Sequence, residues 1–441
     1  MDIDEIKALA TQAENSCSLV NAGDFWSNPY LERTQKGDPK APSIPALVWW
    51  LEHPSMGLSH VRFNEFEGVI EAELLPWNQS PHTWTDADTS FLLNTLQEIT
   101  GGLVKNESYV LHALTVVAHK RKYDPLLDML DSLPEWDGIK RADTLVIDFL
   151  GAEDTPYNRF ATRHMLNGAV MRAYNPGCQY DECIVLSSQA QGIGKSTLAR
   201  KLALSDRFFT DNLGSITSKD ASENIQGIWV CEISELASIA KKSVTLESVK
   251  KFLSHREDRY RASYARFATT RKRRTIFVGT TNSTAFLADR TGNRRFFPIA
   301  CHVNEPKLDI FSSDADNHIK QALAEVVSEY HEKGFLPLVI PDEIKSEADR
   351  VSESFTVADH KEGLISAWVD ERKPGERVCI LQVLDEVFDV PRSEASKPSN
   401  KALTNEISQI LDLMPTLKRI GRVKHSKVYG QQRCWECKPN S

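Results

Sequence analysis

No apolar run in the sequence approaches the length of about 20 residues that is needed to cross a bilayer. The first residues, Met1 to Glu5, are acidic where a secretion signal would be basic. Cysteine is scarce as well: the chain has eight in 441 residues, and this does not indicate a disulfide framework. These absences predict a cytoplasmic protein with reduced thiols and no membrane partner.

A zinc site and a broadly basic surface have little support. Cys434 and Cys437 have the spacing of half a zinc site, but no second Cys or His pair follows at a matching distance. The formal net charge is -8, so any surface for nucleic acid must be local. Hydrophobic residues make up 41% of the chain and charged residues 26%, the balance of a soluble globular protein.

The sequence pattern divides the chain into five segments. Residues 1–45 are rich in Pro, Gly and Asn and predict an arm or linker. Residues 46–135 show helical periodicity and predict a mostly helical domain. Over 136–305 short apolar runs alternate with helical segments, which predicts an α/β domain with helices on a sheet. Residues 306–375 are expected to form a helical linker or lid, and 376–441 a separate C-terminal domain.

The strongest motif lies between a predicted strand and a predicted helix: Ser187-Ser-Gln-Ala-Gln-Gly-Ile-Gly-Lys-Ser-Thr197. It has the form of a phosphate loop (P-loop), in which small residues let backbone N–H groups face inward at a helix N-terminus. Lys195 is expected to reach the β- and γ-phosphates of ATP, and the Ser196 hydroxyl to ligate magnesium. Gln189 stands where the usual pattern has glycine. The alternative is a chance Gly-Lys-Ser at a helix start. The predicted nucleotide contacts are Gln191, Gly192, Ile193, Gly194, Lys195, Ser196 and Thr197.

A P-loop also needs an acid to hold magnesium and position water. Glu232 lies inside the next apolar run and Glu235 at its exit. Because the carboxyl ends of parallel strands face the nucleotide, Glu235 is favoured as the water-polarising residue, with Glu232 as second choice, for the metal. A further apolar strand ends in Asn282, whose amide could contact the γ-phosphate and water. The plain alternatives are a surface glutamate and a turn asparagine.

Arginine marks two more segments. Either Arg294 or Arg295 is expected to act as a finger in a neighbouring subunit's nucleotide site, the alternative being an ordinary ion-paired arginine. Residues 255–274 are dense in arginine and interleaved with aromatic residues, so they predict contact with nucleic acid rather than a solvated charge run. The residues expected to contact DNA are Arg261, Arg266, Arg271, Lys272, Arg273 and Arg274.

From residue 123 to residue 298 the chain resembles the virulence-associated protein E family, ATPases of phages and genomic islands related to superfamily 3 helicases. The matching residues are Asp124-Pro125, Trp136-Asp-Gly138, Gln191 to Ser196, Glu232, Glu235-Leu236, Lys250, Phe252-Leu253, Tyr260-Arg261, Tyr264, Gly279 to Asn282, Asp289 and Gly292 to Phe296. The resemblance implies an AAA+-like core, a hexameric homo-oligomer, and a hairpin before Asn282 that lines a central channel. Residues 376–441 resemble a winged-helix domain, with a basic wing over 419–435.

Taken together, these features predict an ATP- and magnesium-dependent DNA helicase or translocase. It would act as a ring on single-stranded or forked DNA, in the replication of a phage or mobile element within a bacterial host. The alternative is a nucleotide-gated DNA-binding initiator or switch ATPase that does not unwind. A small-molecule kinase with the same loop is a third hypothesis, against which the two arginines and the basic segment argue.

Overall fold

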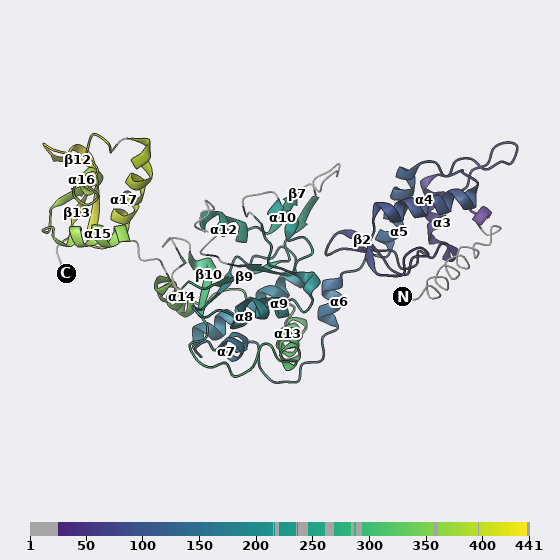
Figure 1. The fold of residues 1–441 in the computed structure, drawn as a ribbon, viewed down its shortest axis with the longest axis horizontal. Helices are drawn as coiled ribbons and strands as arrows, with labels where there is room; N and C mark the ends of the chain where they lie inside the picture. The colour runs from purple at the N-terminus through teal and green to yellow at the C-terminus, as the bar shows by residue number, and fades with distance from the viewer. Residues whose placement is uncertain are drawn as a thin grey trace. The chain divides into compact units, whose positions relative to one another are not determined.

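The computed structural model forms two compact units, Met1–Thr284 with Arg290–Ser354, and Ala285–Asp289 with Phe355–Ser441. Figure 1 shows the helices and strands of each. The described residues are 25–438 without 215, 217–219, 235, 237–245, 261–268, 284–285, 288–292, 356–359 and 396.

In its described residues, the N-terminal part of the first unit combines three α-helices with a small antiparallel sheet of order β1-β2-β3, and this sheet was not predicted. Thr85 and Asp88 begin α4 with a capping box, in which each side chain accepts the other's backbone N–H. Phe25 stacks on Trp50 with ring centroids 4.8 Å apart, and its carbonyl accepts from the Trp50 indole. Residues 25–45 therefore belong to this folded core and are not the predicted linker. The elements are α3 (Ile44–Glu52), β1 (Arg62–Asn64), β2 (Val69–Ala72), β3 (His82–Thr83), α4 (Asp86–Thr100) and α5 (Glu107–Lys120).

The centre of the first unit is a parallel sheet of order β10-β4-β9-β6-β5. The apolar runs that predicted strands are buried along almost their whole length, as expected for a sheet covered on both faces. The predicted α/β core is confirmed. Because all five strands run the same way, their carboxyl ends meet at one edge. The strands are β4 (Cys183–Ser187), β5 (Phe209–Thr210), β6 (Val230–Ile233), β9 (Ile276–Thr281) and β10 (Phe296–Ala300).

Helices cover both faces of this sheet; Figure 1 shows α7, α8, α9 and α13 on one side and α10 and α12 on the other. α13 packs on α8 and buries Ile319, Leu323 and Val326 in the main core. Residues 306–375 are helical, as expected, but they do not form one linker or lid: α13 and α14 belong to the α/β core, and α15 to the second unit. The helices are α6 (Pro125–Asp131), α7 (Leu145–Leu150), α8 (Pro156–Tyr174), α9 (Lys195–Leu202), α10 (Asp220–Asn224), α12 (Leu246–Leu253), α13 (Asp314–Lys333) and α14 (Asp342–Ser354).

The basic segment forms an antiparallel pair, β7 (Glu257–Tyr260) with β8 (Thr269–Lys272). Arg259 pairs in register with Thr270, and Asp258 with Arg271. Only three residues, 273–275, separate β8 from β9, so the pair is joined directly to the central sheet.

Where the structure describes it, the second unit combines three α-helices with an antiparallel sheet of order β11-β13-β12. Its core includes Trp368, Val378, Leu384, Ile407 and Trp435. Cys434 and Cys437 are buried free thiols on β13, and no cluster suited to a metal occurs in the described part of the chain. Nor is any helix there long and apolar enough to span a membrane. The elements are α15 (His360–Asp370), β11 (Arg377–Cys379), α16 (Ile380–Glu386), α17 (Lys401–Leu413), β12 (Leu417–Ser426) and β13 (Gly430–Cys437).

Candidate active site

A pocket of about 510 Å³ lies at the carboxyl ends of β4, β6 and β9. It forms there because β9 lies between β4 and β6, so the residues that follow these strands come together at one edge. Every residue predicted to contact nucleotide lines it. The lining residues are Gln191, Gly192, Ile193, Gly194, Lys195, Ser196, Thr197, Ser234, Thr280, Thr281, Asn282 and Phe311.

Two glycines shape the loop that enters this pocket. Gly192 and Gly194 have φ angles of 73° and 91°, in the left-handed region that favours glycine. At Gly194 a Cβ would also clash with Cγ2 of Ile310, so this position excludes side chains for two reasons. Gln189 is not among the residues with positive φ, so the loop needs no glycine there. The loop closes instead around Ser188, whose Oγ accepts from the Ala190 N–H at 3.2 Å.

Lys195 begins α9, and its side chain is nearly buried in the pocket wall. Its Nζ donates to Oδ1 of Asn282 at 2.9 Å and to the carbonyls of Ser188 and Ala190 at 3.4 and 3.3 Å. An ammonium group thus stands at a helix N-terminus, where the helix dipole also favours an anion. The structure brings Lys195 and Asn282 together as the sequence pattern required.

Glu232 is the acid that the structure places in this site. It is 2% exposed, and its Oε1 accepts from the hydroxyls of Ser196 and Thr280, each at 2.6 Å. A carboxylate and two hydroxyls form an all-oxygen set, which suits a hard cation such as Mg²⁺. Glu235, the favoured acid in the sequence analysis, lies outside the described residues, whereas Ser234 beside it lines the pocket.

Thr280 and Phe311 are pocket residues that the sequence analysis missed. Thr280 had a usable signal, because residues two apart on a strand share a face and Thr280 precedes Asn282 by two. Phe311 had none, since it follows β10 in a segment assigned to a linker. Two buried thiols near the sheet, Cys183 and Cys301, are not nucleophiles: burial raises the pKa of each to about 12, so both stay protonated.

The two candidate finger arginines are not in this pocket. They end a short 3-10 turn, Asn293–Arg295, directly before β10, whose Phe296 pairs with Cys183 at the amino ends of the strands. The pocket is at the carboxyl ends, about 15 Å away along a five-residue strand. Arg295 donates to the Ser254 hydroxyl at 2.9 Å and lies 3.8 Å from Asp181, while Arg294 is exposed.

Two of the predicted DNA contacts are structural instead. Arg273 is 2% exposed, pairs with both oxygens of Asp258, and lies over the Phe252 ring at 4.4 Å. Arg274 pairs with Asp124, the N-cap residue of α6. Both charges are neutralised within the fold, which argues against DNA contact by these two residues.

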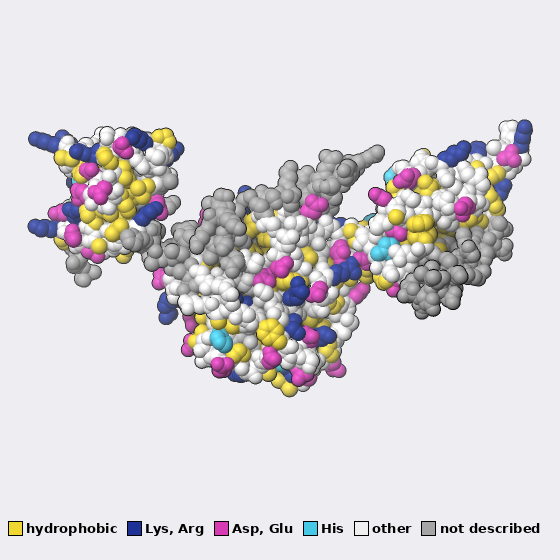
Figure 2. Space-filling model, viewed as in Figure 1, with side chains coloured by type: hydrophobic (Ala, Val, Ile, Leu, Met, Phe, Trp, Pro, Cys, Tyr) yellow, Lys and Arg dark blue, Asp and Glu magenta, His cyan; other side chains and the backbone are white. Residues whose placement is uncertain are grey.

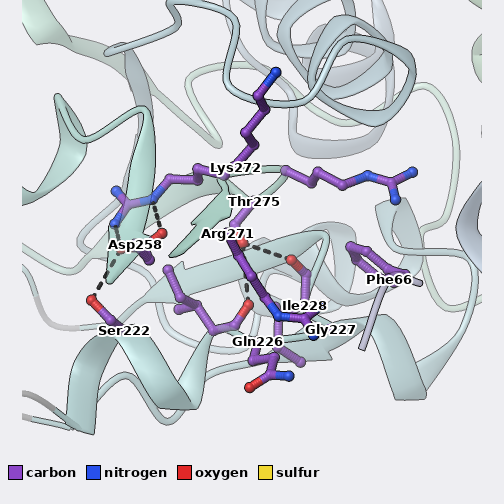
Figure 3. A pocket seen from close by; sticks show the side chains of 12 residues that line it. Phe66, Ser222, Gln226, Gly227, Ile228, Asp258, Arg271, Lys272 and Thr275 are labelled. Carbon is purple, nitrogen blue, oxygen red and sulfur yellow. Dashed lines mark hydrogen bonds and ion pairs between the residues drawn. The ribbon is translucent and has the colours of Figure 1, made fainter. Parts of the chain in front are cut away.

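The structure describes two of the four remaining predicted DNA contacts, Lys272 and Arg271. Lys272 is exposed, and Figure 3 shows its side chain directed away from Asp258. Arg271 is half-buried and donates to the Glu65 carbonyl at 3.2 Å. Arg261 and Arg266 lie outside the described residues.

A sequence model of the virulence-associated protein E-like domain matches residues 130–357, just over half of the chain. The chain belongs to the virulence-associated protein E-like family. The family domain coincides with the α/β core and ends close to Ser354, where the first unit ends. It extends beyond residue 298, where the resemblance in the sequence stopped, and so includes α13 and α14.

Two solved structures are similar to this member of the virulence-associated protein E-like family. The apo structure of NrS-1 C terminal region (305-718) is 14% identical, covers 86% of this chain and 95% of its own, and has a TM-score of 0.42. The A form apo structure of the same region is 12% identical, covers 86% and 96%, and has a TM-score of 0.41. None of the curated proteins matches the chain at a significant level.

Proposed function

We propose that this chain is an ATP-dependent DNA helicase or translocase that acts as a ring in the replication of a phage or mobile element. The observation that carries the proposal is the convergence of two contacts in one pocket. Lys195 meets Asn282, and Ser196 meets Glu232, where the ends of β4, β9 and β6 come together. Membership of the virulence-associated protein E-like family supports a role in such replication.

In this proposal the pocket residues divide the work of ATP hydrolysis. The inward-facing backbone of 191–194 and the Lys195 ammonium bind the phosphates. Ser196 and Glu232 hold Mg²⁺, which when bound neutralises charge on the phosphates. Asn282 contacts the γ-phosphate, where its amide can donate to oxygen and accept from water. Glu235, the residue after Ser234 in the sequence, is proposed to polarise the attacking water.

The positions of the arginines support an assembly of several subunits. Arg294 lies at the amino ends of the strands, whereas the pocket lies at their carboxyl ends. Arg294 is therefore remote from the pocket of its own subunit. An exposed arginine at that edge can complete a neighbour's site, as fingers supplied in trans do. Arg295 is held by Ser254, so we assign the finger to Arg294. Repeating such a contact around a closed ring gives the proposed hexamer.

A mixing experiment tests this arrangement. We expect Lys195→Ala and Arg294→Ala each to have little ATPase activity alone, since one removes the phosphate contact and the other the finger. In a ring assembled from equal amounts, about a quarter of the sites have an intact lysine and an intact neighbouring arginine, so activity should reappear. Phosphate release measured before and after mixing decides the point. A mixture no more active than its components would contradict a finger in trans.

The DNA path is proposed along the β7–β8 pair. Lys272 is exposed, and the pair leads through residues 273–275 into β9, which ends beside Asn282. A continuous stretch of backbone therefore connects the proposed DNA-binding pair to Asn282, the residue proposed to contact the γ-phosphate. We retain Arg261, Arg266, Arg271 and Lys272 as proposed DNA contacts.

The second unit is proposed to be a winged-helix domain, with β12 and β13 as the wing. Arg422 and Arg433 are directly opposite each other in the register of this hairpin, and both are exposed. Like charges at such positions repel, and binding of a phosphate would relieve the repulsion. Figure 2 shows Lys and Arg side chains projecting from this unit. This surface favours the second candidate function, a nucleotide-gated DNA-binding switch that does not unwind.

Strand displacement separates the two functions. The full chain is incubated with ATP, Mg²⁺ and forked DNA duplexes carrying either a 3′ or a 5′ single-stranded arm, and release of the labelled strand is followed. ATP-dependent release that Lys195→Ala lacks supports the helicase. DNA-stimulated ATPase activity with no release from either fork favours the switch. An ATPase rate that does not respond to DNA contradicts both.

A further inference from the structure

Phe311 is the one aromatic residue among the described residues that line the pocket, and it is 62% exposed. Most of the other lining side chains are polar or absent, which suits phosphate and metal. An exposed phenylalanine ring cannot hydrogen-bond with water, and covering it with an apolar surface is favourable because apolar area is removed from water. The ring is therefore a surface suited to a ligand face that is flat and apolar.

The turn that carries Phe311 is fixed by hydrogen bonds and packing. The Asp309 carboxylate accepts from the Phe311 N–H at 2.9 Å, and the Asp309 carbonyl accepts from the Ser312 hydroxyl at 2.7 Å. Ile310 is buried and packs against Gly194, where a Cβ would clash with it. The Phe311 ring lies beside the same glycine, with its Cζ 3.6 Å from the place of a Cβ there. The Phe311 ring and Ile310 therefore both pack against Gly194 in the loop that enters the pocket.

We propose that Phe311 is a stacking platform for the base of the nucleoside triphosphate whose phosphates bind at Lys195. The inference rests on the proposed function, in which this pocket holds ATP. A cavity of about 510 Å³ lies within the range of about 300–1,000 Å³ for small-molecule sites and has room for more than a triphosphate group. Stacking uses the face of a base and not its edge, so the site accepts all four bases and holds the larger purines more tightly.

Binding of two ligands to the full chain tests the proposal. Calorimetric titration with Mg²⁺ present compares ATP with inorganic tripolyphosphate, which has the phosphates and lacks the base. Phe311→Ala should weaken ATP binding by about 10-fold or more, the usual loss when a stacking ring is removed, and leave tripolyphosphate binding unchanged. Phe311→Tyr should restore ATP binding, because tyrosine retains the ring. The loss for CTP should be smaller than that for ATP.

Phe335→Ala is the matched control, because Phe335 is 60% exposed and does not line the pocket. It should change the affinity for neither ligand. If Phe311→Ala weakens both ligands equally, the ring supports the loop and the stacking proposal is overturned. Unchanged ATP binding in Phe311→Ala overturns it as well, while the loss of both ligands in Lys195→Ala would leave the proposed function intact. A wild-type chain that binds neither ligand contradicts the proposed function itself.

Discussion

Replacing Lys195 with alanine is expected to lower kcat/KM for ATP hydrolysis by a factor of about 10³ or more, since losing even one preorganised donor costs about 10²–10³. The side chain supplies a full positive charge at a site that is nearly buried, where charge is screened less than in water. Phosphate release with and without DNA measures the effect. Full DNA-stimulated activity in this variant would remove the assignment of the pocket.

Lys201→Ala is the matched control for this prediction. Lys201 lies on the same helix, and its Nζ pairs with Asp316 at 2.5 Å outside the pocket. Surface ion pairs of this kind contribute about 0–1 kcal/mol, so stability and activity should change little. A large loss of activity in Lys201→Ala would mean that the helix as a whole, and not the ammonium of Lys195, is required.

The contact between Lys195 and Asn282 predicts how two variants combine. Both side chains are proposed to act on the same phosphate, and the 2.9 Å hydrogen bond holds each in place. Asn282→Ala alone should therefore reduce hydrolysis, and the double variant should be little worse than Lys195→Ala. Residues that act as a unit give such non-additive losses. Fully additive losses would indicate that the two side chains work independently.

The parts of the site that the sequence predicted are those set by local pattern. The spacing of Gly192, Gly194, Lys195 and Ser196 determines a strand, a loop and a helix start within a few residues. Asn282 could be placed beside them because parallel strands bring their carboxyl ends to one edge. The same reasoning, applied to the residue two positions before Asn282, would have found Thr280.

The parts that failed depend on partners far away in the chain. Local charge density suggested that Arg273 and Arg274 face DNA, but Asp258 and Asp124 are 15 and 150 residues from them. A run of basic residues does not say which of its members are turned inward. The assignment of α13 to a linker or lid was mistaken for a related reason. An amphipathic helix has the same sequence pattern in a lid as on a core, and only the contact of α13 with α8 distinguishes the two.

Arg273 and Lys272 are neighbours for which we expect opposite results. Arg273→Met should lower the free energy of unfolding by about 3–5 kcal/mol, because it leaves the buried Asp258 carboxylate without its partner. Lys272→Ala should change it by no more than about 0.5 kcal/mol, because the side chain is exposed on β8. Denaturant unfolding of both variants measures the difference.

The salt dependence of DNA binding should also distinguish these two residues, but here the Lys272 variant should show the larger effect. Lys272→Ala should reduce the slope of log affinity against log salt by about 1, since one phosphate contact is lost. Arg273→Met should leave the slope unchanged under conditions where the chain stays folded, because its charge is already neutralised by Asp258. Arg273→Met combined with Asp258→Leu should recover part of the lost stability, since an apolar pair leaves no buried charge. A reduced slope in folded Arg273→Met would return that residue to the DNA path.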